Sequence, residues 1–275
     1  MTFDLSRVEF SAYDLKNKIQ IPREPSEDLA YLIGIHVGDG SMNVYKNRHL
    51  YSVRGHKIDD KEHYIQVIKP LFKKVYNMDF NLREFGDVFG FQFASKAVVT
   101  FENRVLGLPF GPKKEVEMPL VFLDNQKLAT AVVRGLFDTD GCVYLENKRG
   151  KAYPRLEITT TSSRLVSQIK AVLLRNNIQS FVWKVERENW RPCFRIRVSG
   201  YTGLEKWLQI VGMNNPKHLK KVAPWVGFEP TTSRLTASRP TRVTCRIARS
   251  TAELPGHERI IRMRVKKATR YYCRS

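Results

Sequence analysis

The spacing of apolar residues in the first half of the chain predicts a helix, two strands, a helix, two strands and a short closing helix. The first helix begins after a capping Ser26 and an acidic turn, and its apolar residues Leu29, Leu32, Ile33 and Ile35 recur at helical intervals. Period-two alternation and shorter apolar runs predict the elements that follow. These are expected at residues 44–58, 60–76 with an interruption at Pro70, 80–85 and 88–95.

The second half repeats this order at an offset of 101 residues. A cap at Asp124 or Asn125 precedes a helix with apolar Leu128, Val132 and Leu136. Later elements are expected at 142–161, 162–176, 180–186 and 193–199. The predicted fold class is α+β, with two pseudo-symmetric αββαββα units built on antiparallel sheets. The predicted boundaries are an N-terminal extension at 1–21, units at 22–123 and 124–224, and an irregular basic tail at 225–275.

A nine-residue motif ends the first helix of each half. LIGIHVGDG closes at Asp39 and Gly40, and VRGLFDTDG closes at Asp140 and Gly141. A lone Asp-Gly is usually only a turn, but two copies in matching contexts favour a shared function. Each copy also has a mid-helix glycine, Gly34 or Gly135, which costs about 1 kcal/mol relative to alanine. Such glycines predict that the two helices approach each other closely.

The charge of the chain indicates a polyanionic partner. The formal net charge is +20, of which residues 222–275 carry +9 and residues 1–221 carry +11. Nucleic acid is the default partner of such a field, although ribosomal, heparin-binding and membrane-surface proteins are also basic. No apolar run is long enough to cross a bilayer, so we expect a soluble, cytoplasmic protein without a membrane partner. Four widely separated cysteines do not have zinc-site spacing and are expected to be reduced.

The paired motifs resemble the signature of the LAGLIDADG, or DOD-type, homing endonucleases, and the resemblance covers about residues 22–221. It implies that the two motif helices pack at a pseudo-twofold axis and that each sheet curves into a saddle over the DNA major groove. It implies a monomeric, metal-dependent endodeoxyribonuclease that cuts both strands of a long site and promotes the mobility of the intron that encodes it. The expected partner is double-stranded DNA, with the protein's own intron RNA as an alternative.

The resemblance also implies which residues do the chemistry. Asp39 and Asp140 are expected to be catalytic and to bind Mg²⁺ or Mn²⁺ together with Gly38 and Thr139, because hard divalent ions prefer oxygen ligands. Lys96, which follows the fourth strand, is the expected catalytic lysine, with a plain surface lysine as the alternative. The sixth motif position, acidic in Asp138, is Val37 in the first copy, and this position is expected to be structural.

The expected DNA-binding residues lie at strand ends and on strands. A polar residue ends the second strand in relatives, which makes His56 or Lys57 the candidate in the first half, with Thr160 or Thr161 in the second. This asymmetry between the halves could make one strand cut faster than the other. Basic residues on the later strands suit DNA contact, and the sequence leaves open which reach bases and which reach phosphates. They are Arg155, Lys184, Arg195 and Arg197.

Three rival functions share the same fold. An RNA-binding maturase would be favoured by loss of an acidic residue, and a catalytically inactive regulator by loss of both, yet Asp39 and Asp140 are present. An intein-embedded nuclease is disfavoured because the chain starts with Met1 and ends in Cys273-Arg274-Ser275, without the expected splice-junction residues. The expectation is a freestanding enzyme.

The tail at 225–275 has two interpretations. Its arginines and prolines are typical of a basic arm that adds nonspecific phosphate contacts. Alternatively, Gly227-Phe228-Glu229-Pro230 can be encoded by the complement of the T-arm consensus of a tRNA gene, so the reading frame would run through such a gene. Deletion of the tail should then leave folding intact.

Overall fold

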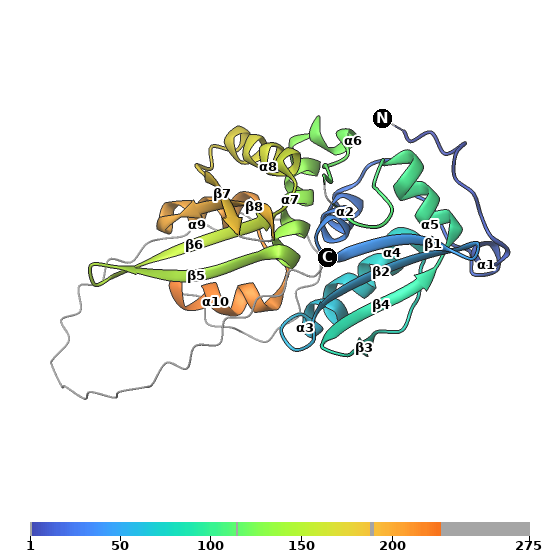
Figure 1. Cartoon of the computed structure of the whole chain (residues 1–275), viewed down its shortest axis with the longest axis horizontal. Helices are drawn as coiled ribbons and strands as arrows, with labels where there is room; N and C mark the ends of the chain where they lie inside the picture. Colours follow the sequence, from blue (N-terminus) through green and yellow to red (C-terminus); the bar gives the residue numbers. More distant parts are fainter. Residues whose placement is uncertain (1, 114, 188–189, 227–275) are drawn as a thin grey trace. The chain divides into compact units, whose positions relative to one another are not determined.

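Each half of the chain folds into a four-stranded antiparallel sheet with helices packed against it (Figure 1). The computed structural model describes residues 2–113, 115–187 and 190–226. The strand order is β1-β2-β4-β3 in the first half and β5-β6-β8-β7 in the second. The two orders correspond strand for strand, which confirms the predicted α+β fold with two related units. The predicted tail lies outside the described residues from position 227 onward.

The first half contains α-helical segments, two π-helical turns and four strands among its described residues. Their bounds are α1 Ala12–Lys16, α2 Glu27–Asp39, β1 Gly40–Tyr45, β2 Arg48–His56, α3 Lys61–His63, η1 Tyr64–Ile68, α4 Lys69–Tyr76, β3 Arg83–Phe85, β4 Val88–Ala94, α5 Lys96–Thr100, η2 Phe101–Val105 and α6 Leu120–Leu123.

The second half follows the same order and begins with a helix equivalent to α2. Its elements are α7 Gln126–Asp140, β5 Gly141–Lys148, β6 Lys151–Thr160, α8 Ser163–Arg175, β7 Phe181–Arg187, β8 Trp190–Ser199, α9 Gly200–Ile210 and α10 Pro216–Val226.

The predicted interruption at Pro70 takes a specific form. Residues 61–76 stay helical, but Tyr64–Ile68 form a π-helical turn immediately before the proline. Because Pro70 has no N–H to donate and its ring crowds the preceding turn, an α-helix would be strained there. The wider π-helical turn places the proline at the start of α4, where a missing N–H costs little.

The sheets separate apolar from polar side chains by simple alternation. In the first half Tyr51, Phe91 and Phe93 face the helices, and the Tyr51 and Phe93 rings stack with their centroids 5.0 Å apart. In the second half the corresponding face is mainly aliphatic, and it includes the paired residues Leu156 and Val198. The opposite face of each sheet carries polar and charged side chains.

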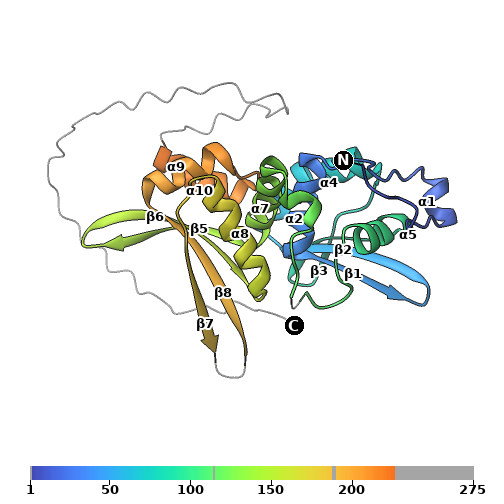
Figure 2. The ribbon, with the colours of Figure 1, turned by 90° about the horizontal axis from the view of Figure 1, so that it is seen from above.

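The helices α2 and α7 pack side by side between the two sheets (Figures 1 and 2). A Cβ atom added to Gly34 would lie 2.2 Å from the carbonyl oxygen of Val132, and one added to Gly135 would lie 2.2 Å from that of Tyr31. Real Cβ atoms do not approach a backbone oxygen so closely, so only glycine fits at either position. The close helix approach predicted from these glycines is therefore confirmed.

The N-terminal segment is anchored to the first half by a buried carboxylate. Asp14, fully buried in α1, accepts hydrogen bonds from the hydroxyl of Ser95 at 2.7 Å and from the backbone N–H groups of Lys96 and Ala97 at 3.1 Å. These N–H groups start α5 and have no partner within their own helix. The segment before α2 thus caps a helix more than 80 residues away in sequence.

In the part of the chain that the structure describes, no helix is long and apolar enough to cross a membrane. Cys142 is exposed and Cys193 is buried, and both are free thiols. Cys245 and Cys273 lie outside the described residues.

Candidate active site at the ends of α2 and α7

The two repeated aspartates end the two packed helices and lie close together. Asp39 is the last residue of α2 and Asp140 the last residue of α7, and in each case a strand begins at the next residue. A Cβ atom added to Gly38 would lie only 3.4 Å from Asp140 Oδ2. The carboxylate of the second helix therefore lies directly beside the end of the first.

Packing around these carboxylates makes their negative charge costly. Asp39 is half-buried, and the Asp140 residue is exposed although many protein atoms surround its carboxyl group. Burial, the nearby Asp140 and the nearby Asp60 raise the pKa of Asp39 well above its usual value. Burial also raises the pKa of Asp140 to about 6, against the opposing effect of Lys113 and Lys217. A cation between the two carboxylates would relieve this cost.

A third carboxylate, Asp60, lies on the Asp39 side of this site. A Cβ atom added to Gly55 on β2 would lie 2.8 Å from Asp60 Oδ2 and 3.0 Å from Asp39 Oδ2, so both carboxylates border the same glycine. Burial alone would raise the pKa of Asp60, but the ammonium of Lys217 and hydrogen bonds from Lys217 and Asn215 hold it below its usual value. The donor-acceptor distances are 2.7 Å to Lys217 Nζ and 2.9 Å to Asn215 Nδ2.

Lys113 caps the carboxyl end of α2. Its ammonium donates to the carbonyl oxygens of His36 and Val37, each at 2.8 Å, and to that of Gly38. The last carbonyls of a helix lack partners within it, and their partial negative charge favours a cation. Burial lowers the pKa of Lys113 to about 8, although Asp140 and Asp39 oppose that shift.

Lys113, Lys217 and Asp60 were not predicted as site residues from the sequence, although a signal for the lysines was present. Both lysines directly follow a proline and come after the last strand of their half, as Pro112-Lys113 and Pro216-Lys217. This repetition parallels that of the two aspartates, and it could have identified the lysines. Asp60 has no such signal, because the residue 101 positions later is Thr161.

The residues present fit a hard divalent ion that keeps part of its water. Among the described residues there is no group of three or more His, Cys, Asp or Glu side chains that could hold a metal by themselves. Mg²⁺ typically takes one or two carboxylates and completes its octahedron with water and substrate phosphate oxygens. Asp39 and Asp140 would supply the two carboxylates. The carbonyl of Gly38 already accepts from Lys113, and the hydroxyl of Thr139 donates to the carbonyl of Leu136 at 2.9 Å.

The structure places Lys96 away from this site. Its ammonium lies 2.5 Å from Glu9 Oε2, and its backbone N–H is held by Asp14. The preceding strand ends at Ala94, which pairs with Leu50, whereas Gly55 beside Asp39 is five residues further along β2. At about 3.3 Å per residue, that separation is about 17 Å. Lys96 was expected at the site because it follows the strand, but β4 ends at the far end of β2 from the site.

The expected DNA-binding residues do not lie together. His56 ends β2 next to the site, with its backbone N–H donating to Asp60 at 2.8 Å, whereas Lys57 is engaged with Glu84 at 2.6 Å. The open face of the second sheet carries Arg155, Arg195 and Arg197. Arg155 pairs with Ser199, and Arg195 and Arg197 pair with Thr159 and Glu157, so all three lie at alternate positions that share one face. Lys184 pairs with Phe194, whereas its neighbour Trp183 pairs with Arg195. Because successive side chains on a strand point to opposite faces, Lys184 lies on the face opposite the three arginines.

At the sixth motif position the two halves differ structurally. Asp138 is fully buried and accepts hydrogen bonds from the hydroxyl of Tyr31 at 2.7 Å and from the backbone N–H of Asn214 at 2.8 Å. Burial raises the pKa of Asp138 to about 6. Val37 packs into the hydrophobic core. Asp138 therefore connects α7 to α2 and to the loop before α10.

Comparisons with known proteins give matches to the second half and to most of the chain. The model of the LAGLIDADG-like domain matches residues 127–212. A glutamine–fructose-6-phosphate aminotransferase of Methanocaldococcus jannaschii is 25% identical over 210 residues, which cover 75% of this chain and 18% of that protein. An uncharacterised protein of the same organism is 26% identical over 180 residues, or 62% of each chain. The chain thus spans about a fifth of the length of the first relative, and that enzyme's activity does not extend to it.

Among solved structures, the homing endonuclease I-DmoI in complex with DNA and Ca superposes with a TM-score of 0.52 at 17% identity, covering 74% of this chain and all of that one. A variant of I-DmoI bound to its target DNA in the presence of Mn superposes with a TM-score of 0.50 at 18% identity, covering 70% and 97%. At this identity the likeness concerns the fold. Residues 127–212 thus contain a LAGLIDADG-like domain, the two halves together have the fold of I-DmoI, and the same motif is repeated at the ends of α2 and α7.

Proposed function

We propose that this protein is a homing endonuclease that hydrolyses both strands of double-stranded DNA at a long specific site, with Mg²⁺ or Mn²⁺, and acts as a monomer. The single observation that carries the proposal is the placement of Asp39 and Asp140 side by side at the ends of two packed helices, with the ammonium groups of Lys113 and Lys217 near both. The two repeated halves would each supply one carboxylate, so that each strand would have a carboxylate near its scissile phosphate.

Each group near the site has a role in this proposal. A bound divalent ion would polarise a phosphate oxygen and lower the pKa of the attacking water. Asp39 and Asp140 would hold the ion, and their raised pKa values indicate that they gain most from a nearby positive charge. Lys113 and Lys217 would offset the negative charge that develops on the reacting phosphate, since fixed cations near such charge lower the barrier. Lys113, with a pKa of about 8, could also exchange a proton near neutral pH.

Two further observations support the proposal. The chain carries a formal net charge of +20, and its second sheet has three arginines on one open face. I-DmoI, which shares the fold, has been solved with DNA and Ca and with target DNA and Mn. Mobility of an encoding intron is the biological role that we attach to this activity.

The test is cleavage of a plasmid that carries the uninterrupted form of the encoding locus. Full-length protein is incubated with this plasmid and Mg²⁺, and nicked and linear products are followed over time. We expect linear product from the wild type, and a loss of at least about 100-fold in rate from both Asp39→Asn and Asp140→Asn, since each removes a charged metal ligand.

Asp59→Asn is the matched control, because Asp59 is an exposed carboxylate one residue from Asp60 and pairs only with His56 at 3.3 Å among the described residues. It should cleave at the wild-type rate. Tight, salt-dependent binding of the plasmid without cleavage by any form would reject the nuclease and leave a DNA-binding protein on the same fold.

A further inference from the structure

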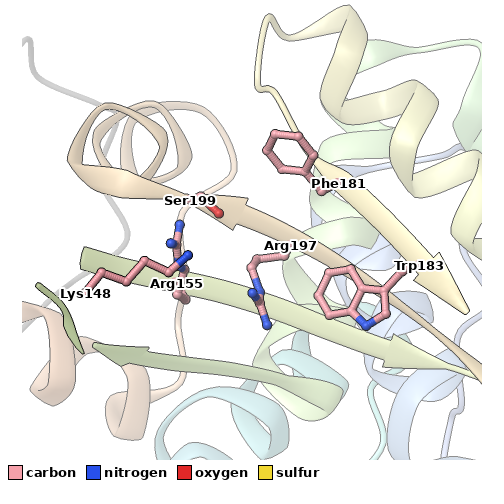
Figure 3. A pocket seen from close by; sticks show the side chains of 6 residues that line it. All are labelled: Lys148, Arg155, Phe181, Trp183, Arg197 and Ser199. Atoms are coloured by element: carbon pink, nitrogen blue, oxygen red, sulfur yellow. The ribbon is translucent and has the colours of Figure 1, made fainter. Parts of the chain in front are cut away.

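The open face of the second sheet contains a basic, aromatic hollow that is not part of the proposed active site. It has a volume of about 350 Å³ and is lined by Lys148, Arg155, Phe181, Trp183, Arg197 and Ser199 (Figure 3). The lining residues come from β5, β6, β7 and β8, so the hollow spans the width of the sheet. The strand register places Arg197 opposite Glu157 on one neighbour and opposite Phe181 on the other, at the inner strand β8.

Arg197 is held in one orientation by two different contacts. Its Nε and Nη2 donate to Glu157 Oε2 at 3.0 and 2.8 Å. Its Cζ atom lies 4.5 Å from the centroid of the Trp183 ring. A guanidinium that is stacked on an aromatic face and hydrogen-bonded to a carboxylate has lost most of its rotamer freedom before any ligand arrives. Binding through this side chain would therefore cost little further ordering.

The donors that remain have a defined geometry. A guanidinium has five N–H groups, and Glu157 engages only those of Nε and one of Nη2. The Nη1–Nη2 edge is left with two parallel N–H groups. Guanine presents two adjacent acceptors, O6 and N7, in the major groove, and a bidentate arginine is the commonest specific contact to them.

The buried glutamate indicates a base contact and not a phosphate contact. Glu157 has only 5% of its surface exposed and also forms a salt bridge with Arg195 at 3.2 Å. A carboxylate beneath the arginines weakens their attraction for the DNA backbone, so it would be unfavourable if charge alone mattered. It is favourable where orientation matters more than charge. By contrast, the Lys148 side chain is 58% exposed at the end of β5, next to Glu146, and suits a mobile phosphate contact.

We propose that Arg197 reads a guanine in the DNA half-site bound by the second sheet, and that Glu157 and Trp183 are positioning residues for its guanidinium. The inference rests on the proposed function, because it concerns the specificity of the same DNA-binding protein. It assigns one base contact that neither the fold nor the charge of the chain specifies.

The test measures base preference directly. Full-length protein selects duplexes from a pool with a randomised target in Ca²⁺, an ion chosen to support binding without cutting, and the selected pool is sequenced. We expect one position of the wild-type profile to require guanine. Arg197→Lys and Arg197→Ala should reduce that preference roughly 10- to 100-fold, because a lysine keeps the charge but not the bidentate edge. Preferences at other positions should change little.

Two further measurements separate orientation from charge. Glu157→Gln should bind random-sequence DNA more tightly, since a negative charge is removed, yet should show a weaker guanine preference because Arg197 is less well held. Replacing the selected guanine by 7-deazaguanine removes N7 and should lower wild-type affinity while leaving Arg197→Lys nearly unaffected. This second measurement uses the wild-type protein, so it tests the idea even if a variant folds poorly.

The control is Arg164→Lys, on α8, whose side chain is 69% exposed and pairs with Glu117, away from the hollow. It should reproduce the wild-type profile. If Arg197→Lys and Arg197→Ala lose affinity equally for all sequences and keep the guanine preference, Arg197 contacts phosphate and the inference is overturned. If the wild type selects no sequence at all, the proposed function itself falls, and the inference falls with it.

Discussion

The carboxyl ends of the two central helices have the same backbone but different surroundings. In the first half His36 lies with its ring centroid 5.0 Å from that of Tyr51 and its Nδ1 3.3 Å from Glu102. In the second half the equivalent residue is Phe137, which packs against Trp207 and His218 with centroid distances of 4.7 and 4.8 Å. A buried polar cluster in one half thus corresponds to an aromatic cluster in the other.

This difference shows which features the site requires. The first cluster is costly, because burial raises the pKa of Glu102 to about 8 and lowers that of His36 well below its usual value. The second cluster is built on the rings of Phe137, Trp207 and His218 instead. The helix contact and the terminal aspartates are the same in both halves, so they constrain the sequence, whereas the packing beneath them has been free to change.

The lysines next to the site show a second asymmetry. Lys113 binds the carbonyls that end the helix of its own half, whereas Lys217 reaches across to Asp60 of the other half. Asn215, close to Lys217 in sequence, also bridges the halves, donating to Asp60 at 2.9 Å and to the carbonyl of Asp138 at 2.7 Å. One half therefore holds its lysine locally, and the other depends on the interface between the halves.

The largest expected effect tests the feature that the halves share. Gly135→Leu and Gly34→Leu should each destabilise the protein by on the order of 3 kcal/mol, because the new side chain meets backbone oxygen that cannot move without separating the helices. Urea unfolding of both variants measures this loss. Gly38→Ala is the comparison and should lose less stability, since Thr139 Oγ1 can rotate away and only Thr139 Cβ, at 2.9 Å, requires a small shift. Wild-type stability in either leucine variant would contradict the close contact.

A slightly smaller effect distinguishes the two lysines. Lys113→Met and Lys217→Met should each slow DNA cleavage about 100-fold. That factor is the low end of the effect seen when an enzyme loses a group that transfers a proton or stabilises developing charge. Only Lys217→Met leaves a buried carboxylate, Asp60, without its cation, so it should also lose stability.

Adding Asp60→Asn should restore that stability without restoring cleavage, and a double-mutant cycle of urea midpoints would measure the coupling. In the Lys113→Met background the same second change should restore nothing. If Asp60→Asn restored the stability of both lysine variants equally, Asp60 would not be paired specifically with Lys217.

The smallest effect concerns a histidine of the aromatic cluster. Burial lowers the pKa of His218 to about 3. His218 therefore stays neutral in the folded protein at pH values where the unfolded chain, with the usual pKa of about 6.5, is already protonated. The stability that neutral His218 contributes is complete above that pH and falls as the pH drops toward 3. The free energy of unfolding of His218→Leu, measured relative to wild type, should therefore increase by about 2 kcal/mol when the pH is lowered from about 7 to about 5.

Urea unfolding at these two pH values tests the prediction. His56→Leu is the control, because the His56 side chain is 58% exposed and meets solvent in both states. A stability difference between His218→Leu and wild type that does not change with pH would show that His218 is hydrated in the folded protein.

The fold was largely predictable because its main signals are local. Apolar periodicity located the helices and strands, and the repeated Gly34 and Gly135 indicated the helix contact from their positions in the sequence alone. The structure places Asp39 and Asp140 at adjacent helix ends. The π-helical turn before Pro70 was predicted only as an interruption, since periodicity does not distinguish a wider helical turn from a break.

The remaining site residues were not predictable in the same way. Lys96 follows a strand as expected, but Asp14 and Glu9 of the N-terminal segment hold it elsewhere. Lys217 and Asp60 are 157 residues apart in sequence and meet only at the interface between the halves. Arg197 and Lys184 look equivalent in sequence, yet their strand registers place them on opposite faces of the sheet.

The sequence by itself determined the duplicated element order, the glycines that only a close helix pair can use, and the two aspartates that end those helices. These features depend on residue spacing within single elements and on steric limits that hold in any context. Only the tertiary structure decided that Lys113 caps α2, that Lys217 pairs with Asp60, and that Glu157 and Trp183 orient Arg197. Such contacts join segments far apart in the chain, and their formation depends on how the packed elements bring those segments together.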